Sequence, residues 1–490
     1  MNDDFQCTIK KPRWSHAPMD DLRIELNRQA GTSLVEQIVE AIGKSISEGR
    51  LYSGARLPSW RDLSAQLGVA RGTVKSAYER LIDEQLLVAR GAAGTFVADQ
   101  LPIAHRADTS DLRGPLPEFY QHPFGDPAMV FQVGIPAQDV FPYKVWSRIA
   151  SRAAREAAMA SVSYPDPRGE PALRAEIAAY LSVARGLVCS PAQVIVTSGY
   201  AGALGLILHA LDLKGATAWT EEPGYPMTRT ALSMAGIEPV PVSVDEQGLD
   251  VDDGLARAPN AALAMVTASQ QAPLGVTLSL ARRHQLLEWA ARRGSWIIED
   301  DYLSELQLIG RAAPALASQD SYGRVVHIGT FSKTVSPGLR LGFIVVPPAL
   351  ANRVGDVAAA LAPAASIASQ RALGEFMRKG HYLRHLRRMK RTYTARRSSL
   401  QRALKTSAAD EAMAGLALLL RLPDGTDDAR IALNALEFGL APAPLSTWYT
   451  DAARARSGLL LGITNIPDEG LDACCNRLKQ LAGIGQEHGI

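Results

Sequence analysis

Two apolar runs that end in reactive side chains constrain the fold of this chain more than any other feature. One run begins at Trp296 and ends in the carboxylate pair and tyrosine of Asp300-Asp-Tyr302. The other begins at Val325 and leads through Thr330-Phe-Ser to a single lysine, Lys333. Open α/β sheets bind their ligands at the carboxyl ends of their strands. We therefore expect an α/β domain with a binding site at that edge.

The chemistry of these side chains fits pyridoxal 5'-phosphate. A lysine that is desolvated among apolar residues titrates downward and becomes nucleophilic towards an aldehyde. The hydroxyl groups near Thr330 and the guanidinium of Arg340 can hold phosphate oxygens. An ionised aspartate such as Asp300 keeps a pyridine nitrogen protonated, and the phenol of Tyr302 can reach the ring hydroxyl. A lysine with a later arginine is common on solvated surfaces, so the prediction depends on both runs together.

The stretches IIEDDYLSE and GTFSK resemble the fold-type I pyridoxal phosphate proteins of the aminotransferase superfamily and, within it, the MocR subfamily of GntR transcriptional regulators. The resemblance implies an α/β transferase-like fold with a large and a small domain. It also implies that Asp300 pairs with the pyridine nitrogen, Tyr302 with the ring oxygen, and Lys333 with the aldehyde as a Schiff base. Thr330 and Arg340 are implied to hold the phosphate.

Three further stretches extend the resemblance around the cofactor. Glu221-Glu-Pro-Gly-Tyr225 is similar to the family's EDPGY, whose tyrosine stacks on the pyridine ring. The helix expected at Gly199-Tyr200-Ala201 offers backbone amides to a phosphate. Tyr164 stands where the family's tyrosine reaches the phosphate of the neighbouring subunit's cofactor. Without the resemblance, Tyr225 and Tyr164 are ordinary aromatic residues of loops and turns.

One loop departs from the family pattern. Transaminases place an asparagine before a proline here, whereas this chain has Ala272 before Pro273, and Gln270 replaces the subgroup's histidine. The missing asparagine normally assists the ring oxygen, which argues against a vigorous catalyst. Gln271 is the candidate to take part of that role.

A second departure lies on a late strand. Amino-acid transaminases of this fold hold the substrate carboxylate with an arginine there, and Leu460 occupies its place. A carboxylate buried without a cation loses a strong pair, so an ordinary amino acid is expected to bind poorly. Arg454 and Arg456 are the candidate substitutes.

The N-terminal part follows a different pattern. Ser33 can cap an amphipathic helix that begins at Leu34 and ends at Gly49. Ser59 can cap a short second helix, Gly68 allows a tight turn, and a third helix follows. Two β-prone runs flank the loop Arg90–Gly94. This order predicts an N-terminal helical domain, a helix-turn-helix with a hairpin wing.

The span from Leu34 to Ala98 resembles the winged helix of the GntR family, whose LPSxRxLAxxLGVSRxTVxxAYxxL pattern it matches almost throughout. Ala70 replaces the serine that usually caps the reader helix, and Gly72 stands where a larger residue is common. Both changes should weaken the start of that helix by about 1 kcal/mol. The resemblance implies that the DNA contacts are made by Arg61, Arg71, Thr73, Lys75 and Gly94.

Basic residues cluster in two places. Between Arg50 and Arg80 they outnumber the acidic residues, which is the one-sided charge that a phosphate backbone needs. The alternative interpretation, a solvated helix face, is disfavoured by the turn, the spacing and the wing. The second cluster, from Arg384 to Arg397, is interpreted as solvated surface, with contact to DNA flanking the operator as the alternative.

Length and composition set the remaining bounds. A chain of 490 residues exceeds one core, and its net charge of +2 makes no case for global nucleic-acid binding. Four cysteines without metal or disulfide spacing favour a reducing cytoplasm, and no signal peptide, membrane span or metal site is expected. We predict an N-terminal arm (1–30), a winged helix-turn-helix (31–98), a linker (99–126) and a pyridoxal phosphate-binding effector domain (127–490).

These features together predict a cytoplasmic transcription regulator rather than an enzyme. The resemblance implies a homodimer, with exchanged DNA-binding domains as one arrangement, that binds double-stranded operator DNA and senses a small-molecule effector. The simplest effector is pyridoxal phosphate itself, as in the PdxR branch, which controls vitamin B6 synthesis. An amino acid, amine or sulfonate is the alternative effector, and a genuine aminotransferase with an accessory DNA-binding domain is the competing class. A scaffold without cofactor is disfavoured because Asp300, Tyr302, Thr330, Lys333 and Arg340 occur together.

Overall fold

The computed structural model describes residues 24–28, 30–99, 128–159, 164–308, 310, 312–361, 365–404 and 409–484. The chain divides into two compact units, Met1–Phe124 and Gly125–Ile490. This division falls within the predicted linker 99–126, which lies almost wholly outside the described residues, as does most of the predicted arm 1–30. The domain limits 31–98 and 127–490 stay a proposal.

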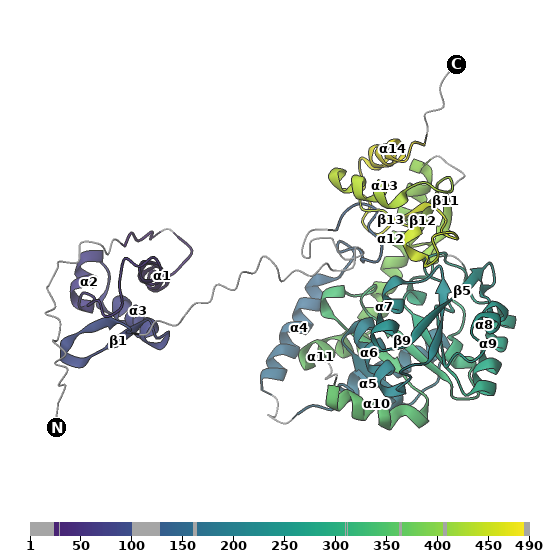
Figure 1. The fold of residues 1–490 in the computed structure, drawn as a ribbon, viewed down its shortest axis with the longest axis horizontal. Coiled ribbons are helices and arrows are strands. Elements are labelled where there is room, and N and C mark those ends of the chain that lie inside the picture. The colour runs from purple at the N-terminus through teal and green to yellow at the C-terminus, as the bar shows by residue number, and fades with distance from the viewer. Residues whose placement is uncertain are drawn as a thin grey trace, which may run out of the picture. The chain divides into compact units, whose positions relative to one another are not determined.

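The N-terminal unit is a winged helix (Figure 1), as the sequence predicts. Its elements are α1 (Leu34–Ser47), α2 (Trp60–Leu67), α3 (Arg71–Asp83), β1 (Leu87–Ala89), η1 (Gly91–Ala93) and β2 (Thr95–Val97). The two strands pair antiparallel and form the wing. A core of side chains from all three helices and both strands, including Ile42, Leu63, Val74 and Val97, holds the unit together.

Local chemistry sets the helix ends of this unit. Ser33 and Glu36 form a reciprocal capping box at the start of α1, and the Ser59 hydroxyl accepts from the backbone at the start of α2. Gly68 adopts a left-handed conformation with φ 60°, which glycine enters at little cost, and this lets α2 turn sharply into α3. Ala70 gives α3 no side-chain cap, as expected from the sequence.

The C-terminal unit is built on an eight-stranded sheet in the order β3-β10-β9-β8-β7-β4-β5-β6. Strands β4, β5, β7, β8 and β9 run parallel, β10 is antiparallel to both of its neighbours, and β6 forms a hairpin with β5. The strands are β3 (Val194–Thr197), β4 (Thr217–Glu222), β5 (Glu238–Asp245), β6 (Gly248–Leu249), β7 (Leu263–Val266), β8 (Trp296–Asp301), β9 (Val325–Thr330) and β10 (Gly342–Val345).

Helices cover both faces of this sheet, so that its central strands are buried on both sides (Figure 1). Neighbouring residues of one strand enter opposite cores: Val326 packs with α6 and α10, and Val325 packs with α8 and α9. The helices are α4 (Tyr143–Ala158), α5 (Pro171–Arg185), α6 (Gly199–Leu211), α7 (Pro226–Met234), α8 (Val251–Arg257), α9 (Leu280–Arg293), α10 (Pro348–Leu361), α11 (Ile367–Arg378) and α12 (His381–Leu404).

A second, antiparallel sheet of four strands forms the smaller part of this unit, in the order β11-β12-β14-β13. Two of its strands, β12 and β14, coincide with the apolar runs Ala417–Leu422 and Leu459–Ile463 of the sequence. The elements are β11 (Ala409–Ala412), β12 (Ala417–Arg421), α13 (Asp428–Ala435), β13 (Ala443–Pro444), β14 (Gly458–Gly462) and α14 (Leu471–Leu481). Within the described part of the chain, no helix is both long and apolar enough to span a membrane.

Candidate functional site

The parallel strands of the large sheet end side by side around a small pocket. Its lining residues come from the ends of β4, β7 and β8 and from α6 and α7. Among them are Tyr200, Glu221, Tyr225, Arg229, Thr267 and Asp300. The pocket therefore lies at the edge of the sheet where the sequence predicts the site.

Asp300, at the end of β8, is half-buried and lies near other acids. Burial raises the pKa of its carboxyl to about 8, and the charges of Asp301 and Glu221 add to this effect. Asp301 is itself held by Arg185, whose Nε lies 2.7 Å from its Oδ2. Asp300 therefore ionises readily only when a positive group comes near, which a protonated pyridine nitrogen would supply.

Lys333 follows β9 in a turn at the same edge. Burial lowers the pKa of its amine, while the charge of Asp300 acts in the opposite direction. Its Nζ donates to the Gly134 carbonyl oxygen at 2.6 Å. Gly134 has φ 80°, and a Cβ there would lie 3.0 Å from the Lys333 Nζ, so the segment leaves the amine room because it carries no side chain.

Tyr302 provides an independent test of whether the pocket fits pyridoxal phosphate. Its hydroxyl is buried and has no hydrogen-bond partner among the described residues. Buried polar groups are nearly always paired, so an orphaned phenol beside Asp300 needs an outside partner. The ring oxygen of pyridoxal phosphate is a suitable one. The residues present therefore fit the cofactor that the sequence predicts.

The expected phosphate end lies where α6 begins. Gly199 starts the helix with φ 77°, and the carbon of the Arg340 guanidinium lies 3.6 Å from where a Cβ on Gly199 would be. Ser332 donates its backbone amide to the Thr330 hydroxyl at 3.2 Å, and the Thr330 hydroxyl donates to the Ser332 hydroxyl at 3.1 Å. A helix start, a guanidinium and a hydroxyl pair form a site for an anion. The Ala201 amide belongs to the same first turn.

Aromatic rings line the opposite side of the pocket. Tyr225 precedes α7, and its ring centroid lies 6.1 Å from that of Tyr200 and 5.9 Å from that of Trp448. The Tyr200 hydroxyl is fixed by a 2.7 Å hydrogen bond to Thr228. The predicted stacking residue thus lies at the pocket, and Tyr200, which the sequence offers only for its backbone, contributes a ring as well.

Gln271 requires a correction. Its amide nitrogen donates to the Pro223 carbonyl at 2.7 Å and to the buried Glu221 carboxylate at 3.3 Å, and its amide oxygen accepts from the Leu274 backbone at 3.0 Å. These partners occupy the side chain, so the structure does not support Gln271 as a partner of the ring oxygen. It holds Glu221 and the loop in place because its longer side chain reaches back to β4.

Tyr164 is fully exposed within the single chain, away from the residues that line the pocket. An exposed tyrosine at this position is compatible with the expected role at a partner's phosphate. That role stays a prediction.

The residue after Lys333 is fixed by α12. The Tyr382 hydroxyl donates to the Thr334 hydroxyl at 3.2 Å, and His385 donates its Nε2 proton to the Thr334 carbonyl at 2.8 Å. Tyr382 and His385 are both buried. A sequence pattern does not reveal this contact, since Tyr382 and Thr334 lie 48 residues apart.

A segment of the smaller part is tied to the loop that carries Tyr225. The Glu222 carboxylate accepts from the backbone amide of Thr450 at 2.6 Å. The Gly224 amide donates to the Trp448 carbonyl at 3.0 Å. Because these two contacts hold the residues just before Tyr225, a displacement of this segment would also displace the stacking ring.

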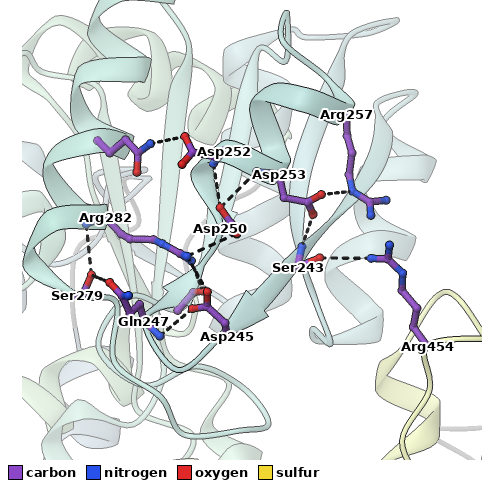
Figure 2. Close-up of polar contacts among 12 residues, drawn as sticks. Ser243, Asp245, Gln247, Asp250, Asp252, Asp253, Arg257, Ser279, Arg282 and Arg454 are labelled. Carbon is purple, nitrogen blue, oxygen red and sulfur yellow. Dashed lines mark hydrogen bonds and ion pairs between the residues drawn. The ribbon is translucent and has the colours of Figure 1, made fainter.

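Figure 2 shows a further contact of the same segment, at the edge of the large sheet. Arg454 donates to the Ser243 hydroxyl at 3.3 Å, and the Ser243 amide donates to Asp253, which also binds Arg257. Arg454 is therefore engaged away from the residues that line the pocket, which argues against its role as a substitute carboxylate clamp. Leu460 is fully buried in β14.

Arg229 is the arginine that the sequence does not single out. It lines the pocket and is more than half buried, and its Nη1 donates to the carbonyls of Gly224 at 2.9 Å and Trp448 at 3.1 Å. Burial lowers the pKa of its guanidinium, and Glu222 opposes this shift. Arg229 becomes a candidate site residue only when the folded loop is known.

The acidic pocket predicts how the cofactor-free protein responds to pH. The pKa values of Asp300 and Glu221 are raised to about 8 and about 7, whereas unfolded carboxyls titrate near 4. The folded state thus holds protons that the unfolded state has lost, and stability should fall as pH rises from about 4 to 8, by at most about 1.4 kcal/mol per pH unit for each proton. Chemical denaturation of the cofactor-free protein at several pH values measures this decline.

The Asp300→Asn variant should show a shallower decline, and Asp356→Asn serves as its control because Asp356 is exposed on α10. An identical pH dependence in the wild type and in Asp300→Asn would contradict the burial of an ionisable Asp300.

The predicted DNA contacts lie in the N-terminal unit. Arg61, Arg71 and Lys75 are exposed at α2 and α3, and Thr73 is half-buried in the first turn of α3. Arg61 covers the ring of Trp60, and Lys75 pairs with Glu79 at 3.5 Å. Gly94 lies in the wing with φ 110°, where the Arg56 side chain leaves little room for a Cβ. The three basic side chains are therefore accessible to a partner at the helix-turn-helix.

Two families match the chain. Residues 129–423 match the aminotransferase class I and II family, and residues 34–97 match the bacterial regulatory proteins of the gntR family. The first match contains Lys333 and the pocket, and the second contains all of the predicted DNA contacts.

Full-length relatives share this combination of units. The probable rhizopine catabolism regulatory protein MocR of Rhizobium meliloti is 34% identical over 93% of this chain and 94% of its own length. The HTH-type pyridoxine biosynthesis transcriptional regulator PdxR of Corynebacterium glutamicum is 34% identical over 78% of this chain and 82% of its own.

Among solved structures, the α-aminoadipate aminotransferase LysN of Thermus thermophilus, complexed with N-(5'-phosphopyridoxyl)-L-leucine, superposes with a TM-score of 0.64 and 26% identity. The superposition covers 73% of this chain and 92% of that chain. It corresponds in length to the C-terminal unit.

Proposed function

The chain belongs to the MocR-type regulators of the GntR family, and from this premise we propose that it binds operator DNA and senses pyridoxal 5'-phosphate itself. Membership of the family makes it an aminotransferase-like, pyridoxal phosphate-dependent transcriptional regulator. What we add is the identity of the effector.

One observation carries this proposal: the strand that usually supplies the substrate's arginine has Leu460, which is fully buried. A carboxylate placed against Leu460 would lose its water without gaining a cation. The cofactor alone can therefore satisfy the site. The PdxR relative, named for its control of pyridoxine biosynthesis, supports the same effector.

We assign the following roles to the residues around the cofactor. Asp300 would keep the pyridine nitrogen protonated, Tyr302 would donate to the ring oxygen, and Tyr225 would stack on the ring. Lys333 would hold the aldehyde carbon. The backbone at Gly199, Tyr200 and Ala201 would bind the phosphate together with Thr330 and Arg340. When bound, pyridoxal phosphate supplies an electron-withdrawing ring.

We also propose a homodimer in which Tyr164 reaches the partner's phosphate. Its complete exposure in the single chain supports this assignment, because covering an aromatic ring at an interface is favourable and its hydroxyl can still donate to a phosphate. A dimer also suits paired operator half-sites.

An amino-acid, amine or sulfonate sensor is the second candidate, and Arg229 is the observation that favours it. Among the described residues, hydrogen bonds engage only its Nη1, so the rest of the guanidinium is left for a ligand of the pocket that it lines. A carboxylate or sulfonate could pair with it. A genuine aminotransferase stays the competing class, and it would turn over an amino donor with a keto acid.

The test is operator binding by the cofactor-free and the cofactor-loaded protein. We expect pyridoxal phosphate alone to change the dissociation constant for the operator by about tenfold, equivalent to about 1.4 kcal/mol of coupling free energy. Titration of common amino acids into the loaded protein should change neither the visible spectrum nor DNA binding. Fluorescence anisotropy with a labelled duplex measures the DNA binding, and absorbance measures the spectrum.

Equal DNA binding with and without cofactor, together with a spectral shift on adding one amino acid, would reject the proposed effector. In that case Arg229→Gln should abolish the response to the amino acid, which identifies Arg229 as the clamp. Arg293→Gln, an exposed change on α9, is the matched control.

A further inference from the structure

Helix α12 has an extreme charge for a protein whose net charge is only +2. Its 24 residues include eight lysines and arginines and no aspartate or glutamate. Like charges on one helix repel each other. An imbalance over six turns therefore destabilises the helix unless a negatively charged partner compensates it.

The charges of the first half of α12 follow one face of the helix. Arg384, Arg387, Arg388 and Arg391 have the spacing i, i+3, i+4, i+7, and all four are exposed. We call these four residues the arginine stripe. The buried residues of the same turns are Tyr382, His385, Leu386, Met389 and Tyr393. The helix is thus amphipathic, and every charged residue on the solvent face of this part is positive, although Leu383 is exposed there too.

Within the described residues, no carboxylate forms an ion pair with the arginine stripe. Arg384 donates instead to the Lys379 carbonyl at 3.0 Å and contacts His381. Several basic residues of other helices pair with an acidic residue one turn away, as Lys75 does with Glu79. Among the described residues, the arginine stripe is therefore left without a carboxylate partner, whereas Arg396 further along α12 pairs with Asp139 at 2.7 Å.

Position on the helix adds a second cost. The stripe begins at the fourth residue of α12, and the N-terminal end of a helix carries partial positive charge, which disfavours cations there. Burial is the main cause that lowers the pKa of the His381 imidazole, and the positive charges of Arg384 and Lys379 lower it further. This is the effect expected in a positive potential. A solvated surface needs no such arrangement, whereas a surface that binds a polyanion does.

We infer that the arginine stripe binds the phosphates of double-stranded DNA next to the operator. This rests on the proposed operator binding by the N-terminal unit. From Arg384 to Arg391 the helix rises about 10 Å, which matches the axial rise of about three phosphates of one strand. Arginine suits this role because its planar fork contacts phosphate oxygens in pairs. The stripe reads no sequence, so it adds affinity rather than specificity.

The buried face of α12 contacts the loop that carries Lys333. Tyr382 and His385, which flank Arg384 in the sequence, hold Thr334 next to Lys333. One helix therefore touches the cofactor loop on one face and presents the stripe on the other.

The experiment compares two duplexes in the presence of saturating pyridoxal phosphate. The full-length protein first selects an operator from a random pool. The short duplex contains only that operator, and the long duplex adds about 20 base pairs of fixed sequence on each side, well beyond what one helix-turn-helix half-site covers. Affinity is measured as a function of salt concentration for each.

In the main variant all four stripe residues become glutamine. On the short duplex its affinity should stay within about twofold of the wild type. On the long duplex it should bind at least about tenfold more weakly, and the slope of log affinity against log salt should be shallower by about 2 to 4, because each lost phosphate contact removes about 0.9.

Two further variants complete the design. A four-lysine variant of the stripe should keep most of the salt slope because it keeps the charge. The control changes Arg292, Arg293, Arg353 and Arg430 to glutamine; these exposed residues of other helices give the same change in net charge. This control should bind both duplexes like the wild type.

An unchanged slope for the glutamine variant on the long duplex overturns the inference, as does an equal loss in the control or in the lysine variant. These results leave operator binding itself intact. If the wild type selects no sequence and binds neither duplex specifically, the proposed function fails, and the inference fails with it.

Discussion

Replacing Lys333 by alanine should abolish the covalent, borohydride-reducible attachment of pyridoxal phosphate. Lys333 is the lysine at the ends of the parallel strands, and burial lowers the pKa of its amine, which increases the fraction able to attack an aldehyde. The residues that line the pocket include no lysine that could replace it, and Lys333 itself is held at the same edge of the sheet by the Gly134 carbonyl. The loss should therefore be complete, and visible absorbance together with a peptide map of the reduced protein measures it.

The variant should nevertheless keep non-covalent affinity for the cofactor. The start of α6 and Arg340 do not depend on Lys333, so equilibrium dialysis should still detect bound pyridoxal phosphate. This result separates a lost covalent bond from a misfolded chain. Lys214→Ala, an exposed change, is the control. Recovery of pyridoxyl on a different lysine in the reduced wild type would contradict the assignment.

The cofactor site can be predicted in part because its chemistry lies at strand ends. Asp300, Tyr302, Thr330 and Lys333 each lie at or just after the end of an apolar run, and parallel strands bring such ends together whatever the rest of the fold does. That these ends lie on neighbouring strands follows from the strand order, which the sequence does not state but the family resemblance implies.

Other parts of the site depend on long-range contacts that a single sequence does not reveal. The Gly134 carbonyl accepts a hydrogen bond from the Lys333 amine, although the two residues are 199 positions apart in the sequence. Glu221 becomes a candidate site residue only in the folded chain, where the backbone amide of Thr267, just after β7, donates to it. The sequence suggests a wrong role for Gln271 because this residue lies next to the position of the missing asparagine. In the structure its side chain instead forms hydrogen bonds with Glu221 at the end of β4 and with Pro223. A single sequence cannot show which of two partners a buried amide satisfies.

The N-terminal unit is easier to predict because its signals are local. Caps at Ser33 and Ser59 and the left-handed Gly68 fix the ends of α1 and α2 within a few residues. The missing cap at Ala70 is visible too, since it needs only the residue type at one position. Which charges meet DNA is not local, because it depends on a partner.

The double variant Arg61→Ala/Arg71→Ala should lose most of the affinity for the selected operator. Both side chains are exposed at the starts of α2 and α3, where the helix-turn-helix is expected to meet DNA, and neither forms an ion pair among the described residues. A lost phosphate contact weakens binding to all sequences and flattens the salt slope by about 1, whereas a lost base contact costs about 1 to 3 kcal/mol at one position. Anisotropy titrations over a range of salt concentrations distinguish the two.

The control is Lys44→Ala in the same unit. Lys44 is exposed on α1, outside the basic span from Arg50 to Arg80, and its Nζ lies 3.9 Å from the Glu48 carboxylate, so its loss should leave operator binding within about twofold. The double variant of Arg61 and Arg71 should fail on the short duplex as well as on the long one, unlike the glutamine variant of the arginine stripe. Retention of operator affinity by this double variant at moderate salt would move the DNA contacts away from α2 and α3, because the variant removes a cation from the start of each helix.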